Sequence, residues 1–219
     1  MEIKIVYDNR ALPGFTPSHG FSCLVDTPDG YLLFDTGWSG PILLENLRRF
    51  NIQLEKIKYV FLSHFHWDHI GGLPDLLAYI KPIVYVLNSF STNFKNEVKK
   101  ITELIEVKNK SEILPGFFST GGINNKNIVE QSLVIKYKNN IIVISGCAHP
   151  GLDKILEKAS SIGKVNYIIG GFHDFKNLEI LSVVNNIMPC HCTKFRENIL
   201  EKYATCARRI EAGSIIKII

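Results

Sequence analysis

The sequence lacks any long hydrophobic segment. None of its apolar runs approaches the roughly 20 residues that a helix needs to cross a bilayer. The start, Met1–Val6, resembles a short strand and lacks the basic end and long apolar centre of a secretory signal peptide. Five cysteines, an odd number, also fit poorly with a secreted disulfide framework. These absences predict a cytoplasmic protein with no membrane partner.

Two widespread catalytic motifs are also missing. The chain has neither a GxSxG nucleophile turn nor a GxxxxGK[ST] phosphate-binding loop, which argues against covalent serine catalysis and P-loop chemistry. It has no CxxC pairs of the kind that complete a structural zinc cluster. Charge is nearly balanced, with 25 Lys and Arg against 21 Asp and Glu, a net charge of +4. We expect no nucleic-acid partner, although a weak preference for anionic substrates stays open.

The hydrophobic pattern predicts one domain of the α/β class over residues 1–219. The chain is 46% hydrophobic, enough for an ordinary packed core. Two halves each begin with a strand hairpin and then alternate helix and strand, which favours two mixed sheets packed face to face with helices outside, a four-layer αββα sandwich. Residues 91–128 are less regular and predict a surface excursion or a substrate-facing flap. We expect strands at 3–7, 21–26, 31–34, 59–62, 83–87, 133–137, 141–145, 166–169, 187–188 and 214–218, and helices near 42–50, 75–79, 152–162, 176–186 and 194–211.

A cluster of histidines is the most informative feature that is present. His64, His66, Asp68 and His69 place four potential metal ligands in six residues, directly after the apolar run Tyr59–Leu62. In an extended segment alternate residues share a face, so the first three would point into one site, and a turn at Asp68 would bring His69 beside them. Imidazole and carboxylate groups suit zinc and other first-row metals. A polar loop with clustered histidines, or one face of a helix, is the weaker interpretation, because three of only seven histidines fall here.

Further polar residues follow other predicted strands. In α/β folds, sites gather at the carboxyl ends of strands, so these residues are expected on the same rim as the histidine cluster. His149 and His191, in glycine- or proline-rich surroundings, are candidate ligands. His173 is a candidate for contact with substrate or with the ligands, and less so for a ligand itself. Asp35 either caps the next turn or, as we prefer, accepts the second N–H of a ligand histidine.

The cysteines near His191 look at first like a thiolate site. Cys190 and Cys192 flank His191, but in a strand they point away from it, so all three rarely bind one ion. We expect both to be packing residues. Cys147 is expected beside the ligands, with direct metal binding as the lesser alternative.

The motif HxHxDH formed by His64, His66, Asp68 and His69 is the signature of the metallo-β-lactamase superfamily, which the chain resembles over nearly its whole length. The early Asp35-Thr36-Gly37 turn, Ser63 and Gly71-Gly72-Leu73 also fit. A closer resemblance is to the subgroup labelled 7,8-dihydropterin-6-methyl-4-(β-D-ribofuranosyl)aminobenzene 5′-phosphate synthase-like proteins. It is carried by Asp8-Asn9, His19-Gly20-Phe21-Ser22, residues 145–151, Gly170-Gly171-Phe172-His173 and His191-Cys192-Thr193.

The resemblance implies an αββα sandwich with a two-metal hydrolase-type site. Carried over by position, His64, His66 and His149 would hold one metal, and Asp68, His69 and His191 the other. Many superfamily members have a bridging aspartate where this chain has Gly146-Cys147-Ala148-His149. Either His149 or Cys147 replaces it, or a solvent oxygen alone bridges the metals. After Thr193 the subgroup often has glycine, whereas here Lys194 either binds a substrate phosphate or is merely solvated.

The chemistry expected of such a site is hydrolysis. Two divalent cations, with zinc favoured and manganese or iron open, lower the pKa of a shared water, and the resulting metal-bound hydroxide attacks phosphorus or a carbonyl. Iron is disfavoured because di-iron members typically carry a glutamate where this chain has His66. Asp68 would both ligate and orient the nucleophile, and His173 would donate a proton to the leaving group or bind an anionic substrate.

We therefore predict a binuclear metal-dependent hydrolase acting on a small anionic molecule, phosphorylated or pterin-like, with His173 and Lys194 contacting the substrate. Pterin biosynthesis is implied by the subgroup label alone. The alternatives are a phosphodiesterase or lactonase of the same fold, or a non-catalytic metal-bound ligand sensor. The intact ligand set argues against the sensor. Homo-oligomerisation stays open.

Overall fold

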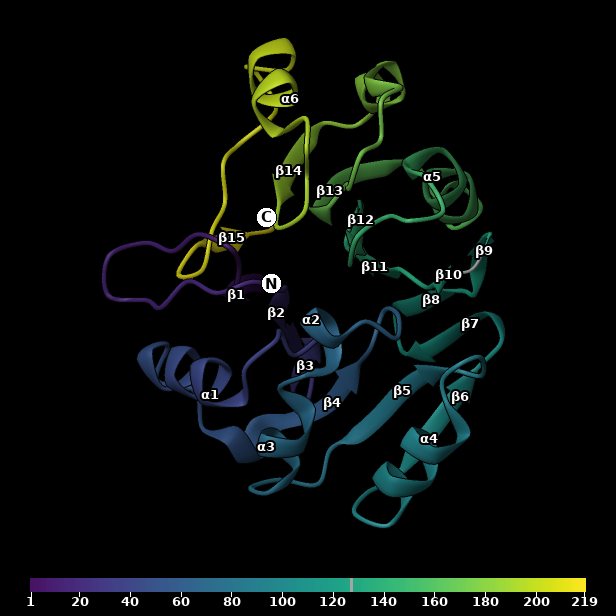
Figure 1. The fold of residues 1–219 in the computed structure, drawn as a ribbon. Coiled ribbons are helices and arrows are strands. Elements are labelled where there is room, and N and C mark those ends of the chain that lie inside the picture. The colour runs from purple at the N-terminus through teal and green to yellow at the C-terminus, as the bar shows by residue number, and fades with distance from the viewer. Residues whose placement is uncertain (127) are drawn as a thin grey trace. The chain divides into compact units, whose positions relative to one another are not determined.

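The computed structural model describes residues 1–126 and 128–219 and contains two compact units. Unit 1 comprises Met1–Glu106 and Glu211–Ile219, and unit 2 comprises Val107–Ile210. Each unit is built around a sheet that mixes parallel and antiparallel strands (Figure 1). The α/β class expected from the sequence is confirmed.

The sheet of unit 1 has seven strands among the described residues, in the order β15-β1-β2-β3-β4-β5-β6. β2 and β3 form the expected antiparallel hairpin, and β3, β4 and β5 run parallel to one another. The apolar carboxyl-terminal parts of β3 and β4, Leu32–Phe34 and Val60-Phe61, are fully buried. The strands are β1 (Glu2–Tyr7), β2 (Ser22–Thr27), β3 (Gly30–Phe34), β4 (Ile57–Phe61), β5 (Ile83–Leu87), β6 (Leu104–Val107) and β15 (Ile215–Lys217).

The helices of unit 1 follow its parallel strands. α1 buries Leu43 and Leu47, one helical turn apart, and packs on β1 and α3 (Figure 1). Pro41 stands in its first turn, and Arg48 and Arg49 in its last turn favour the negative end of the helix dipole. The helices are α1 (Gly40–Arg49), α2 (Trp67–Ile70), α3 (Leu73–Leu77) and α4 (Thr92–Lys99), with a 3₁₀ turn η1 (Leu54–Lys56).

Unit 2 repeats this organisation. Its larger sheet has the order β14-β13-β12-β11-β8-β7, in which β12, β13 and β14 are parallel and the other neighbours antiparallel. A separate hairpin joins β9 and β10. The strands are β7 (Asn109–Leu114), β8 (Phe117–Gly121), β9 (Ile123–Asn125), β10 (Ile128–Glu130), β11 (Leu133–Tyr137), β12 (Asn140–Ser145), β13 (Val165–Gly171) and β14 (Asn186–Cys190).

A hydrophobic core lies between this sheet and the helices α5 (Leu152–Ser160) and α6 (Arg196–Lys202). Val143 and Ile168 of the sheet, Ile155 of α5 and Ile199 of α6 belong to it and are almost completely buried. α5 packs on β13 and β8, and α6 on β14. A 3₁₀ segment, η2 (Leu178–Val183), adds Leu181.

Three expectations about elements were wrong. The described residues within 91–128 are not irregular: they form α4, β6, β7, β8, β9 and the start of β10, although a role as a flap stays a prediction. Residue 127 lies outside the described residues. The helix expected at 176–186 is the 3₁₀ segment η2, because only Leu181 of its side chains is buried. The helix expected at 194–211 is limited to α6 and ends at Lys202. No helix within the described residues is long and apolar enough to cross a membrane.

Candidate metal centre

In unit 1, the histidine motif is tied to the turn that follows β3. The carboxylate of Asp35 is fully buried and accepts hydrogen bonds from the Ser63 backbone N–H and hydroxyl, each at 2.7 Å. His69 Nδ1 lies 2.7 Å from Asp35 Oδ2. Thr36 donates from its backbone N–H and its hydroxyl to the carbonyl of His69, at 2.7 and 3.0 Å. Asp35 therefore lies where its carboxylate can orient the His69 ring. That His69 is a metal ligand stays a prediction.

The motif itself does not continue as an extended strand, contrary to the alternation argument. β4 ends at Phe61, and α2 begins at Trp67, so Asp68 and His69 lie on a helical turn. His66 is extended and precedes the first helical residue. The hydrogen bond from His69 N–H to the carbonyl of His66 closes this turn at 3.0 Å. The turn, rather than the alternation of a strand, aims the last two polar side chains.

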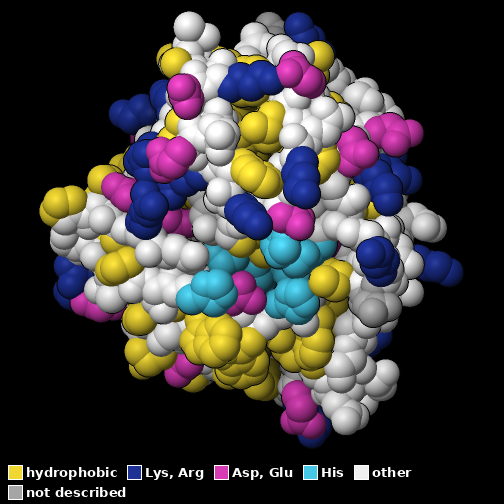
Figure 2. All heavy atoms as spheres, turned by 45° about the horizontal axis from the view of Figure 1, so that its top comes forward, with side chains coloured by type: hydrophobic (Ala, Val, Ile, Leu, Met, Phe, Trp, Pro, Cys, Tyr) yellow, Lys and Arg dark blue, Asp and Glu magenta, His cyan; other side chains and the backbone are white. Residues whose placement is uncertain are grey.

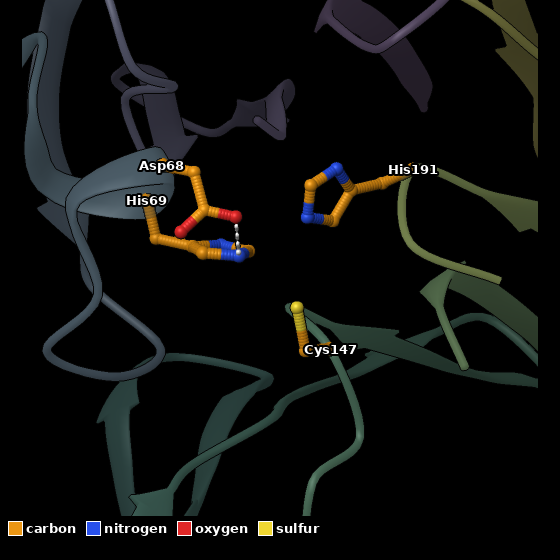
Figure 3. Close-up of side chains that lie close together, drawn as sticks. All are labelled: Asp68, His69, Cys147 and His191. Carbon is orange, nitrogen blue, oxygen red and sulfur yellow. Dashed lines mark ion pairs between the residues drawn. The ribbon is translucent and has the colours of Figure 1, made fainter. Parts of the chain in front are cut away.

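The side chains of the motif form two close pairs. His64 Nε2 lies 3.0 Å from His66 Nδ1, while His64 Nδ1 faces the Ser63 hydroxyl at 2.9 Å. His69 Nε2 lies 3.4 Å from Asp68 Oδ2, the ion pair marked by the dashed line in Figure 3. The rings of His64 and His69 are 4.2 Å apart between centroids, so the two pairs are neighbours. Unit 1 thus brings together all four residues predicted from the motif.

Burial and charge act against each other on the His69–Asp35 pair. Burial raises the pKa of Asp35, while the His69 ring opposes that rise. For His69, burial lowers the pKa, but the carboxylates of Asp35 and Asp68 outweigh it and raise it to about 10. The two carboxylates therefore favour the charged form of the His69 ring. A metal ion bound at Nε2 would require that nitrogen to be deprotonated.

His19 and two tryptophans lie near Asp68. His19 Nε2 lies 3.4 Å from Asp68 Oδ2, and the His19 ring is 6.0 Å from that of Trp38 between centroids. Trp38 and Trp67 are 49% and 53% exposed, which is high for such large rings. A Cβ on Gly71 would lie 2.3 Å from the Trp38 carbonyl and 2.8 Å from Trp67 Nε1, so only glycine fits between them. Histidine and hydrophobic side chains are both visible on the face shown in Figure 2.

In unit 2, a buried glutamate holds the loop that follows β12. Glu130 accepts backbone hydrogen bonds from Cys147 and Ala148 at 2.9 Å and from His149 at 2.8 Å. Three consecutive N–H groups directed at one carboxylate fix the loop and satisfy a charge that would be costly to bury alone. Sequence analysis missed Glu130. Its only signal was a charged residue beside a strand, and the bonded residues are 17 to 19 positions away.

The loops after β12 and β14 bring Cys147 and His191 together. The Cys147 sulfur and a ring nitrogen of His191 lie within 4.8 Å of each other. Cys192, the next residue, has its sulfur 3.2 Å from that of Cys147. The Thr193 hydroxyl accepts from the Phe172 N–H at 3.0 Å and donates to the carbonyl of Cys190 at 2.7 Å, which anchors the loop. Figure 3 shows Cys147 and His191 in separate loops, each at the end of its strand.

His173 follows β13 and lies beside His149. Their ring centroids are 4.8 Å apart, and His173 Nδ1 lies 3.2 Å from Asp174 Oδ1. The hydrogen bond to His173 lowers the pKa of the exposed Asp174. Lys194 donates its backbone N–H to the His173 carbonyl at 2.8 Å, and its ammonium lies 6.0 Å from the centre of the Phe195 ring. The two predicted substrate residues are thus close in the fold.

The strand ends of both units share an uncommon backbone conformation. Asp35 after β3, Ala148 after β12, His173 after β13 and His191 after β14 have positive φ angles of 53°, 56°, 44° and 47°. Residues with a Cβ are rarely found there, and such strain is concentrated at functional sites. These conformations could not be predicted from the sequence, because none of the four residues is glycine.

The match to a family model covers residues 15–179 and is to the metallo-beta-lactamase superfamily. The chain belongs to this superfamily. The αββα fold class and the family expected from the HxHxDH motif are thereby confirmed.

The proteins that are similar over nearly the whole chain include a curated relative and two solved structures. The 7,8-dihydropterin-6-methyl-4-(beta-D-ribofuranosyl)-aminobenzene-5'-phosphate synthase of Methanocaldococcus jannaschii is 29% identical over 93% of this chain and 91% of its own. The structure of Tm1679, described as a metal-dependent hydrolase of the beta-lactamase superfamily, aligns with a TM-score of 0.83 at 28% identity and covers 100% of this chain and 99% of its own. Human tRNase Z, short form, aligns over 100% of both chains with a TM-score of 0.72 at 13% identity, which shows the fold alone.

Proposed function

We propose that this superfamily member is a hydrolase that uses two divalent metal ions, with zinc favoured, on a small anionic substrate. The observation that carries the proposal is the spacing of the donor pairs in unit 1. Two ligands on one tetrahedral zinc, with bonds of about 2.0–2.2 Å, lie roughly 3.3–3.5 Å apart. The His69–Asp68 pair at 3.4 Å fits this spacing, and the His64–His66 pair at 3.0 Å needs only a small adjustment. The outer nitrogens of His64 and His69 are already held by Ser63 and Asp35.

Each pair supplies two ligands, and a catalytic zinc takes three or more from the protein. We assign His149 as the further ligand of the His64–His66 ion, and His191 as the further ligand of the Asp68–His69 ion. Cys147 is assigned as a donor beside His191, in place of the aspartate that many members carry. The support is chemical: imidazole and sulfur are both zinc ligands, and these two lie within 4.8 Å of each other in unit 2.

When bound, the ions would supply an acidified water and stabilise negative charge that develops on the substrate. The protein's own groups would do the rest. Asp68, paired with His69 and His19, would hold and orient the attacking water through its carboxylate. His173, whose Nδ1 lies 3.2 Å from Asp174 Oδ1, would give a proton to the leaving group, and Lys194 would attract the substrate's anionic group.

The substrate class follows from the exposed aromatic rings. Trp38 and Trp67 are each about half exposed, and the Trp38 ring lies 6.0 Å from that of His19, which faces Asp68. A planar heteroaromatic ring, such as the dihydropterin in the name of the M. jannaschii relative, would stack on one of them. We expect a pterin phosphate to quench tryptophan fluorescence, and a Trp67→Leu variant to weaken its binding. Equal affinity in the Trp67→Leu and Trp38→Leu variants and the parent protein would contradict the stacking.

Metal content and turnover test the central proposal. We expect about two zinc ions per chain by elemental analysis, falling to about one in both His66→Ala and His69→Ala. Hydrolysis of bis-p-nitrophenyl phosphate should fall by at least about a hundredfold in both variants. Phe65→Ala, within the same motif, is the matched control and should keep both ions. Full metal content with no turnover of phosphodiester, lactone or pterin phosphate would favour the non-catalytic sensor.

A further inference from the structure

Two thiols of unit 2, those of Cys147 and Cys192, lie unusually close to each other. Cys147 follows β12, Cys192 follows β14, and their sulfur atoms are 3.2 Å apart. The two strands are the neighbours of β13 on either side, and all three run parallel. The pair is therefore created by sheet topology between residues 45 positions apart in the sequence.

Gly171, at the end of β13, makes this approach possible. A Cβ at that position would lie 2.7 Å from the Cys192 sulfur and 3.3 Å from the Cys147 Cα. A side chain at position 171, the end of β13, would therefore displace the Cys192 sulfur. The two loops are also fixed, that of Cys147 by Glu130 and that of Cys192 by Thr193. The proximity of the sulfurs is thus built into the fold and does not depend on one flexible side chain.

We propose that Cys147 and Cys192 form a reversible oxidation site that closes to a disulfide in the presence of a hydroperoxide. The sulfurs need to approach by about 1 Å to reach disulfide bonding distance. Cys192 is the partly exposed member, whereas Cys147 is only 3% exposed, so the oxidant meets Cys192 first.

The chemistry balances with hydrogen peroxide as the oxidant. Peroxide transfers one oxygen to the Cys192 sulfur, which becomes a sulfenic acid, and one water is released. The Cys147 sulfur then attacks the Cys192 sulfur, the S–O bond breaks, the S–S bond forms, and a second water leaves. Two thiols are oxidised by two electrons in total, and one peroxide is reduced to two waters. A dithiol reductant restores both thiols.

The consequence of oxidation rests on the proposed function. Cys147 is assigned there as a metal donor, and His191 directly precedes Cys192. A disulfide would remove the Cys147 donor and pull on the His191 loop. Oxidised protein should therefore hold less zinc, and reduction followed by added zinc should restore the content.

Peptide mapping tests the oxidation site directly. The purified, reduced protein is treated with hydrogen peroxide, remaining thiols are alkylated, and tryptic peptides are analysed by mass spectrometry. The expected product joins residues 139–154 to residues 177–194 and disappears on reduction. Cys190 lies in the second peptide, so Cys192→Ser identifies the partner: the cross-link must vanish there and persist in Cys190→Ser. Cys206→Ser, another partly exposed cysteine, is the control and should cross-link like the parent.

Three outcomes separate this inference from the proposed function. A cross-link in the parent that is lost in Cys192→Ser, accompanied by loss of zinc, supports both. A cross-link with unchanged zinc supports the oxidation site and overturns the role of Cys147 as a donor. Irreversible oxidation of Cys192 without any cross-link overturns the oxidation site, whereas the His66→Ala and His69→Ala measurements still judge the function independently.

Discussion

Asp35 shows how much of the histidine cluster rests on one buried residue. Its carboxylate accepts from Ser63 twice and faces His69 Nδ1, and none of these groups has access to water. The sequence suggested this role, because a carboxylate after an apolar strand often orients a ligand histidine. What it could not supply is the partner, since three of the seven histidines lie in the motif and spacing alone does not choose among them.

We predict that Asp35→Asn lowers both stability and metal content. The amide nitrogen cannot accept, so either Ser63 or His69 loses its buried partner. The free energy of unfolding should fall by about 2–4 kcal/mol in urea titrations. Zinc per chain should fall as well, because the His69 ring is no longer held. Asp153→Asn, an exposed substitution in α5, is the control and should leave both values unchanged. A stable Asp35→Asn protein with full zinc would contradict the orienting role.

A second prediction at the residue scale concerns how stability depends on pH at a pair of residues outside the candidate metal centre. The Tyr59 hydroxyl donates to Asp29 at 2.8 Å, which lowers the pKa of Asp29 and raises that of Tyr59 to about 12. Because the folded pKa of Asp29 is lowered, this carboxyl group stabilises the fold at pH values above its unfolded pKa. That stabilisation is lost as the pH falls through the folded pKa. Because the folded pKa of Tyr59 is raised, its phenol group stabilises the fold at pH values below its unfolded pKa. That stabilisation is lost as the pH rises through about 12.

We therefore expect Tyr59→Phe to cost a nearly constant amount between about pH 5 and 9. The pair is largely exposed, so the cost should be under about 1 kcal/mol. Urea unfolding at pH 7 and at pH 3 measures it, and the difference between variant and parent should shrink at the lower pH. A difference that grows in acid would show that the phenol–carboxylate bond is not its source.

At the scale of elements, the strands were predicted better than the helices. β5 and β11 have the predicted bounds, because each is an apolar run with turn residues on both sides. Two helices were predicted too long. At η2 few side chains are buried, and before α6 the hydrogen bonds of Thr193 hold the chain as a loop. The loop conformations depend on positive φ angles and long-range acceptors, which leave no local signature.

The side chain of Glu130 holds the loop after β12 through three backbone hydrogen bonds. The next prediction therefore concerns Glu130→Gln. Glutamine offers one acceptor oxygen and an N–H₂ group where three backbone N–H groups need acceptors. We expect faster hydrogen exchange at the amides of residues 147–149 and a loss of about 1–3 kcal/mol in the free energy of unfolding. Glu112→Gln, which changes an acceptor for Gly116, is the matched control and should leave these amides protected. Unchanged exchange at 147–149 would contradict the holding role.

At the scale of the whole molecule, the chain passes through unit 1, then unit 2, and returns to unit 1 with β15 paired to β1. Each unit has its own mixed sheet, and the predicted polar residues follow its parallel strands, β3 and β4 in unit 1 and β12, β13 and β14 in unit 2. The sequence predicted these strand-end residues because the rule about carboxyl ends requires only the strands. The number of ions, and which ligands bind each of them, cannot be read from strand positions. Both are proposed here from the family motif and from the chemistry of the donor atoms.

The last prediction tests that division through stability. If both ions take ligands from unit 1 and from unit 2, metal binding must couple the unfolding of the two units. We expect the zinc-bound protein to unfold in one calorimetric transition. Chelation should lower the unfolding temperature and separate the transitions of the two units. At free zinc of about 100 times the dissociation constant, each site should add about 2.7 kcal/mol. A His66→Ala/His69→Ala double variant should not respond to chelator or zinc. If the two units unfold together to the same extent with and without zinc, while the metal still binds fully, then shared ligation is wrong and each ion belongs to one unit.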